Sequence, residues 1–195
     1  MGLDISLTAV PIEMDIIFEK AKQKSNTEYP DILCSLPNAF RTDFCDFGHP
    51  DWIEFKKDAN ELLQYYPNKK FESKYYFNPN RAYDVIDYLI AAFLNNTDDR
   101  FINDGIEFNV ATSYQGFALK YWNQEMLHQK ANLLEKITYN DLMQHYDFKK
   151  MKQYGVYKIT QIHHQKEAIE TTFADLKYFL NEAKKINGYV IITKI

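Results

Sequence analysis

The chain has few cysteines, few glycines and no long apolar run. Its 195 residues include two cysteines, six glycines and six prolines, which excludes the dense disulfide framework of small secreted domains. The longest apolar stretch, residues 89–94, is far shorter than the roughly 20 residues that cross a bilayer as a helix. The opening MGLDISLTAV lacks the basic and apolar regions of a secretion signal. We therefore expect a soluble, cytoplasmic protein without membrane contact, in which both cysteines are thiols.

The sequence also lacks the short motifs that identify common enzymes. It contains no phosphate-binding loop, no dinucleotide fingerprint and no Gly-x-Ser-x-Gly elbow. Cys34, Cys45 and His49 carry metal-ligating groups, but ten residues separate the two cysteines, unlike the closely spaced pairs of structural zinc sites. We expect buried thiols, no metal and no cofactor, and the sequence leaves open whether these three side chains converge. Whether the protein is an enzyme stays uncertain, and these absences weigh against it.

What the chain does contain is apolar and aromatic residues in the proportions of a folded domain. Hydrophobic residues make up 46%, aromatic residues 16% and charged residues 26%, and the length suits a single domain with one core. The net charge of −4 is unevenly distributed. Residues 1–119 hold 19 acidic against 11 basic residues, giving −8, whereas residues 120–195 hold 8 against 12, giving +4. Nucleic-acid binding depends on neutralising phosphates with basic side chains. Because the chain is acidic overall, we do not expect it to bind nucleic acid.

Periodicity predicts an α+β fold. Alternation from Leu3 to Ala9 indicates a half-buried strand, and PIEMDIIFEKAKQK then places Ile12, Ile16 and Ile17 on one helical face. Near the other end, residues 165–186 have helical spacing, and YVIITKI is typical of a strand. We predict several helices packed on a small mixed sheet that contains the N- and C-terminal strands.

The segment NPNRAYDVIDYLIAAFL carries the strongest helical pattern. Asn78 is a favourable N-cap and Pro79 suits the first turn, so we predict a helix over residues 79–94. Asp84 and Asp87 lie three residues apart, which places them on neighbouring faces. Such a pair can perform acid/base chemistry if burial separates the two pKa values. A solvated flank of a core helix or a polar recognition surface would use the same residues, and all three interpretations stay open.

Three stretches together resemble the YfbM-like family, catalogued as domain of unknown function 1877. They are the opening MGLDISL, the central NRAYDVIDYLIAAF, and the tail LEKITYNDLMQHYDFKKMKQYGVY with the helix and strand after it. The resemblance implies an α+β, bacterial, cytoplasmic protein and no established reaction. Relatives often have a Trp-His…Leu-His pattern in the central helix, where this chain has Tyr83, Asp84 and Asp87. Residues 25–76 look like an insertion into the family domain, and residues 25–50 within it look like a long ordered loop.

The leading hypothesis is a non-catalytic binding or regulatory protein, for example an immunity-like protein, with a protein partner. It would use an acidic, aromatic surface built from residues 25–76 and the central helix, because the first part of the chain is acidic and rings dominate binding hot spots. The partner and the oligomeric state do not follow from the sequence. The aromatic anchors that we expect on this surface are Tyr29, Phe40, Phe44, Phe47 and Trp52.

The alternative is an enzyme or a small-ligand-binding domain with a pocket beside the 79–94 helix. Its pocket would be lined by Arg81, Tyr83, Asp84 and Asp87, joined by residues from the tail. A third hypothesis places single-stranded nucleic acid on FKKMKQYGVYK, which mixes lysines with tyrosines. The structural interpretation of that turn, as a solvated helix end, is preferred.

Overall fold

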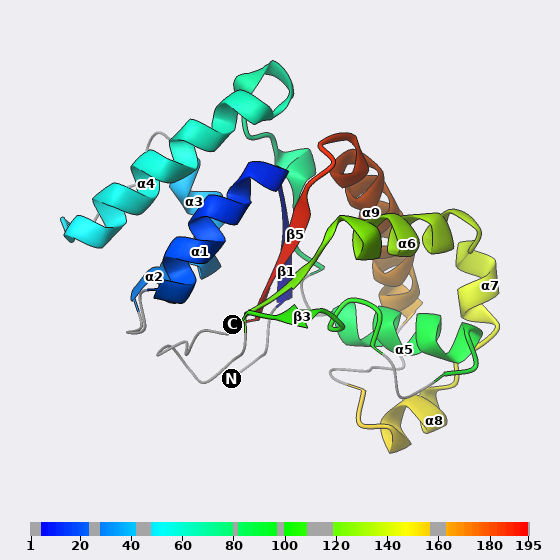
Figure 1. The fold of residues 1–195 in the computed structure, drawn as a ribbon. Coiled ribbons are helices and arrows are strands. Elements are labelled where there is room, and N and C mark those ends of the chain that lie inside the picture. The colour runs from blue at the N-terminus through cyan, green and yellow to red at the C-terminus, as the bar shows by residue number, and fades with distance from the viewer. Residues whose placement is uncertain are drawn as a thin grey trace.

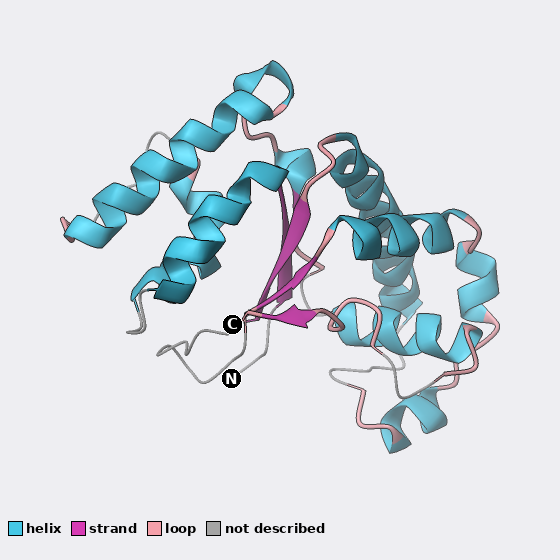
Figure 2. Cartoon of the chain, in the orientation of Figure 1, coloured by secondary structure: helices cyan, strands magenta, loops and turns pink. Residues whose placement is uncertain are grey.

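The chain folds around one sheet with helices on both of its faces. The computed structural model describes residues 5–23, 28–41, 48–79, 82–96, 100–108, 119–156 and 163–194. Within them, five strands form a sheet in the order β2-β1-β5-β4-β3, and Figure 2 shows it between two groups of helices. The predicted single α+β domain is confirmed. The strands are β1 (Ile5–Val10), β2 (Tyr76–Phe77), β3 (Ile106–Glu107), β4 (Lys120–Trp122) and β5 (Tyr189–Lys194).

The first and last strands, both of which we expected in the sheet, lie side by side at its centre. Their register runs from Ile5 opposite Lys194 to Val10 opposite Tyr189. All pairs among the described strands are antiparallel, so the sheet is not the mixed one that we expected. β1 is also buried at every position, including its polar residue Thr8, whereas its alternation predicted a half-buried strand. Helices on both faces of the sheet account for this difference (Figure 1).

One group of helices comes from the first third of the chain. The segment 25–50, which we expected to be a loop, contains two short helices. These helices are too short to display a helical period in the sequence. Pro30 and Pro37 fall in their first turns, where proline is tolerated. Tyr29, in the first of these helices, packs edge-on against Phe55, with their ring centres 5.4 Å apart. Both side chains are fully buried. The group comprises α1 (Asp15–Gln23), α2 (Glu28–Cys34), α3 (Leu36–Ala39) and α4 (Pro50–Leu62).

The predicted insertion therefore shares the core of the sheet. The hydroxyl of Tyr66 donates to the carbonyl oxygen of Ala9 in β1 at 2.7 Å, and this bond is buried. Residues 63–75 connect α4 to β2 through short turns. These turns are η2 (Leu63–Tyr65), η3 (Pro67–Lys69) and η4 (Ser73–Tyr75), and η1 (Ile12–Met14) links β1 to α1.

The second group covers the opposite face of the sheet. The central helix begins at Tyr83, not at Pro79, because the carbonyl of Pro79 accepts from the amide of Ala82 in a preceding turn. Thr138 and Asp141 form a capping box, and the last helix starts within two residues of its predicted position. The group comprises α5 (Tyr83–Phe93), α6 (Gln124–Glu135), α7 (Tyr139–Met143), α8 (Phe148–Gln153) and α9 (His163–Lys185). Within the described residues, none of the helices is long and apolar enough to cross a membrane.

Candidate functional site

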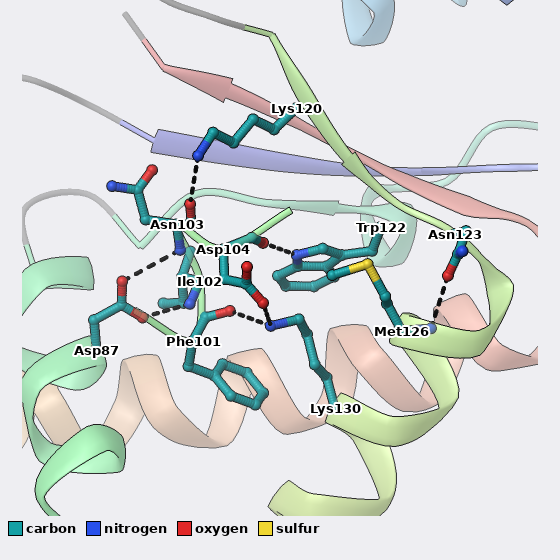
Figure 3. A network of polar contacts seen from close by, with 10 residues as sticks. All are labelled: Asp87, Phe101, Ile102, Asn103, Asp104, Lys120, Trp122, Asn123, Met126 and Lys130. Carbon is teal, nitrogen blue, oxygen red and sulfur yellow. Dashed lines mark hydrogen bonds and ion pairs between the residues drawn. The ribbon is translucent and has the colours of Figure 1, made fainter. Parts of the chain in front are cut away.

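A short loop, residues 100–105, is held in place between α5, α6 and β4. Asp87 on α5 accepts hydrogen bonds from the backbone amides of Ile102, at 2.5 Å, and Asn103, at 3.3 Å. Figure 3 shows this carboxylate pointing at the turn. Asp87 is fully buried, and two backbone donors supply the partners that a buried carboxylate requires. The carboxylate thus fixes the start of the loop to the central helix.

Burial raises the pKa of the Asp87 carboxyl to about 7, and its two backbone hydrogen bonds and the charges of Arg100 and Lys130 only partly oppose this. A raised pKa at a buried carboxyl is one signature of acid/base sites. In this fold, however, both carboxylate oxygens are directed at the backbone of the loop. Asp87 therefore acts as an internal cap and is not the solvated flank that the sequence allowed.

Lys130 on α6 holds the same loop from the other side. Its ammonium donates to the carbonyl of Phe101 at 2.7 Å and to Oδ2 of Asp104 at 3.2 Å. It also lies 4.7 Å from the ring centre of Phe101 and 4.9 Å from that of Trp122, within the range of a cation–π contact. Only 9% of Lys130 is exposed. The lysine is thus a buried charge that carbonyl, carboxylate and aromatic groups surround (Figure 3).

The local sequence explains how Lys130 reaches this position. Asn123 caps α6 by accepting from the amide of Met126 at 2.9 Å, which sets the phase of the helix. Leu127, Ala131 and Leu134 then form its buried face at helical spacing. Lys130 falls on that face three residues after Leu127, so its stem packs in the core while its ammonium reaches the loop.

β4 supplies the third support of the loop. The indole nitrogen of Trp122 donates to the carbonyl of Asp104, and the ammonium of Lys120 donates to the carbonyl of Asn103 at 3.4 Å. Gly105 follows where the loop approaches the sheet, and a Cβ there would lie 2.9 Å from Cδ1 of Ile192. A larger residue would push the loop off the sheet.

A pocket of about 530 Å³ opens beside this loop, between α5 and α6. Its charged lining residues are Arg100, Asp104 and Lys130, so the described lining carries two cations and one anion in a chain of net charge −4. Arg100 is oriented by Asp84, whose Oδ1 lies 3.3 Å from Nη1. The apolar part of the lining includes Ile90, Leu94, Phe101, Met126 and Leu133.

The structure separates the four residues that we expected to line a pocket on the central helix. Tyr83 and Asp87 are buried, and Asp84 is half-buried against Arg100. Arg81 lies outside the described residues. The pocket beside the helix takes its α5 residues from the other end, at Ile90, Ala91 and Leu94.

The predicted aromatic surface is also divided. Tyr29 and Phe40 are core residues, and Trp52 is half-buried against the core. Phe44 and Phe47 lie outside the described residues. Among the described residues of this part of the chain, the exposed rings are Tyr65 and Tyr76.

Of Cys34, Cys45 and His49, the structure describes only Cys34 and His49. Cys34 is half-buried, and burial raises the pKa of its thiol to about 12. His49 caps α4 by accepting from the amide of Asp51 at 3.3 Å. Cys45 lies outside the described residues, among which no group of three His, Cys, Asp or Glu side chains could hold a metal.

A broader hollow of about 920 Å³ lies between α5 and the α7–α8 segment. Its lining includes Tyr88, Tyr154, Lys149 and Lys150. The hollow therefore contacts both the central helix and the tail, the two regions that we expected to line a pocket. Its two lysines are exposed, in keeping with a solvated helix end. The nucleic-acid hypothesis for this turn stays a prediction.

Sequence reasoning missed Lys130, Arg100 and Asp104. One signal was present, because Lys130 interrupts the apolar stripe of α6 at a position where a hydrophobic residue is expected. Arg100 and Asp104 stand in a polar loop whose path depends on tertiary contacts, so nothing in the local pattern marked them.

Fold and site together define an α+β domain with a ligand-sized pocket between two helices. The chain belongs to the family catalogued as domain of unknown function 1877, whose model matches residues 49–193 and therefore includes all of the pocket. The match also includes residues 49–76, the second part of the predicted insertion, and the insertion itself stays a prediction. Comparison with the curated proteins and with the solved structures returned no match.

Proposed function

We propose that this protein binds a small molecule that has an apolar body and an acidic headgroup, in the pocket between α5 and α6. The observation that carries this proposal is the buried ammonium of Lys130 in the pocket wall. A buried charge is costly unless it is paired, and its present ion-pair partner, Asp104, has a side chain that is 58% exposed. An acidic headgroup can replace this exposed carboxylate at Lys130.

The lining matches such a ligand in shape and charge. Ligand pockets in proteins are mostly apolar and carry a few placed polar groups, and their volumes start at about 300 Å³, below the 530 Å³ found here. Arg100 adds a second cation at the edge, where Asp84 holds it through one nitrogen. A carboxylate or phosphate near Lys130 and Arg100 would gain two charge-assisted hydrogen bonds.

Binding without chemistry fits this lining better than catalysis. Among the described lining residues there is no Cys, His or Ser that could act as a nucleophile or base. Asp87, whose pKa is raised, does not line the pocket and is fully occupied by the loop backbone. The pocket therefore supports recognition, with Lys130 as the anchor and α5 and α6 as rigid walls.

Three matched probes test the proposal: 4-phenylbutyrate, its neutral amide and 4-phenylbutylamine. We expect the carboxylate to raise the melting temperature and to shift amide resonances around Phe101 and Lys130, whereas the amide does so weakly and the amine does not. Asp104→Asn removes the competing carboxylate, so it should tighten carboxylate binding about fivefold.

Glu107→Gln is the matched control, because it removes one exposed carboxylate outside the pocket lining. It should leave the affinity unchanged. Binding of all three probes with equal affinity, binding of none, or equal behaviour of the two variants would contradict the proposal. The bacterial and cytoplasmic setting implied by the family resemblance stays a prediction.

A further inference from the structure

Two isoleucines near the start of the chain are exposed although their pattern predicted burial. Ile12 is 41% exposed and Ile16 is 68% exposed, whereas their neighbour Ile17 is 2% exposed. The predicted single helix is divided into η1, which contains Ile12, and α1, which begins at Asp15. The buried residues of α1, Ile17, Phe18 and Ala21, form one face, and Ile16 lies outside that face. Exposed large apolar side chains that gather in one place mark interaction sites.

These isoleucines line a groove together with Tyr65. The groove lies between η1–α1 and α4–η2 and has a volume of about 280 Å³. Tyr65, which is 46% exposed, forms its end on η2. Leu62 and Ile17 close the floor and are buried. The groove therefore offers an apolar floor and three exposed apolar side chains at its rim.

The charged residues of the groove are all acidic. Glu13, Asp15, Asp58 and Glu61 line it, and no lysine or arginine is among its described lining residues. Asp58 is already paired with Lys20, and Asp15 accepts from the hydroxyl of Tyr189 at 2.8 Å.

Glu13 and Glu61 differ from the other two, because among the described residues neither has the ion pair of Asp58 or the side-chain hydrogen bond of Asp15. Their charge is therefore not offset by a basic side chain among the described residues. The first part of the chain, residues 1–119, carries a net charge of −8, and an acidic face of this kind would steer a basic partner toward it.

We propose that this groove binds a basic amphipathic helix of another protein. Apolar side chains of the helix would enter between Ile12, Ile16 and Tyr65, and its Lys and Arg side chains would face Glu13 and Glu61. Helix-in-groove recognition combines an apolar face with flanking charges in this way. An extended peptide fits less well, because walls made of helices offer no strand edge to its backbone groups.

This surface is distinct from the α5–α6 pocket in place and in charge. The two share no lining residue, and they lie on opposite sides of the sheet (Figure 1). One binds an anion and the other a cationic face, so their tests are independent.

The probe is a labelled helical peptide of about four turns, with leucine on one face and lysine on the other. A second peptide carries glutamate in place of every lysine. Binding to the full chain is measured by fluorescence anisotropy at low and at physiological salt. We expect the lysine peptide to bind, more weakly as salt rises, and the glutamate peptide not to bind.

Ile16→Gln should weaken binding of the lysine peptide about tenfold, because it removes an exposed apolar contact. Ile53→Gln is the matched control, since Ile53 is 52% exposed but does not line the groove. Glu61→Lys should weaken the lysine peptide about tenfold. All three positions are exposed, and circular dichroism checks that the variants fold.

Three results would overturn the proposal. The first is absence of binding by the lysine peptide, and the second is equal binding by the Ile16→Gln and Ile53→Gln variants. The third is self-association of the wild-type chain that Ile16→Gln abolishes, because a second copy would then be the occupant of the groove.

Discussion

The two helical groups on either side of the sheet both contain ring contacts and polar contacts, but they differ in which kind predominates. The α1–α4 group packs through rings, with Tyr29 edge-on to Phe55 and Phe40 stacked on Phe71 at 4.7 Å. The α5–α6 side uses directional polar contacts, in which Asp87 and Lys130 fix one loop. Ring packing tolerates small adjustments, whereas buried polar contacts require one geometry. The difference indicates that one side is built as support for a surface and the other positions a loop for a pocket.

The sign of charge follows the same division. The described lining of the α1–α4 groove carries only acidic charges, whereas the α5–α6 pocket carries two cations and one carboxylate. Both sites lie in one small domain, and the sheet separates the helices that line the acidic groove from those that line the pocket with two cations (Figure 1). Strand β1, next to the central strand β5, is buried along its whole length and forms part of that separation.

The largest expected effect is on the aromatic side. Phe55→Ala removes a fully buried ring that packs against Tyr29. The cavity and the lost burial should lower the free energy of unfolding by about 4 kcal/mol. Urea denaturation at two pH values measures it, and the loss should be the same at both because no titrating group is removed. A loss that changed with pH would contradict the assignment of this side to apolar packing.

The next largest effect is on the polar side. Asp87→Ala leaves the amides of Ile102 and Asn103 without their acceptor. Two unsatisfied donors in or near the core should cost about 3 kcal/mol. The same variant should weaken binding of 4-phenylbutyrate, because the loop that carries Phe101 and Asp104 loses its anchor. Full stability with a disordered loop in NMR spectra would show that the loop does not contribute to the core.

A pH profile separates the two sides further. Because burial raises the pKa of Asp87 from 3.8 to about 7, the folded state binds this proton more tightly than the unfolded chain. The associated stability is complete below about pH 4 and is lost as the pH rises through about 7. Wild type should lose about 2 kcal/mol between pH 5 and pH 7 relative to Asp87→Asn, which cannot titrate. Parallel pH profiles of the two proteins would rule out this contribution.

Sequence patterns predicted the fold where residues obey a single period over a long segment. The strands β1 and β5 and the long α9 are of this kind, because alternation and helical spacing are local patterns. The short helices α2 and α3 were missed because seven and four residues are too few to reveal a period.

The pocket between α5 and α6 has a different lining from the one that we expected beside the central helix, because Tyr83, Asp84 and Asp87 do not line it and Arg81 lies outside the described residues. Asp87 is polar and near the N-terminus of α5, which resembles a wet edge in sequence, yet tertiary contacts bury it completely. Its partners Ile102 and Asn103 are main-chain groups, which side-chain patterns cannot identify. Lys130 could have been found, because a lysine within an apolar helical stripe must either snorkel or be paired.

The smallest expected effect is on stability at the groove. Ile16 and Ile17 are adjacent in α1, yet one is 68% exposed and the other 2%. Ile16→Gln should change the free energy of unfolding by less than about 0.5 kcal/mol, as surface substitutions do. Ile17→Ala should cost about 3 kcal/mol because it empties a core site. Thermal and urea denaturation of both variants compare them directly. If Ile16→Gln were as destabilising as Ile17→Ala, the side chain would serve the core of the α1–α4 group. If Ile16→Gln leaves the free energy of unfolding almost unchanged but abolishes peptide binding, Ile16 serves recognition, because the stability of the fold does not require it.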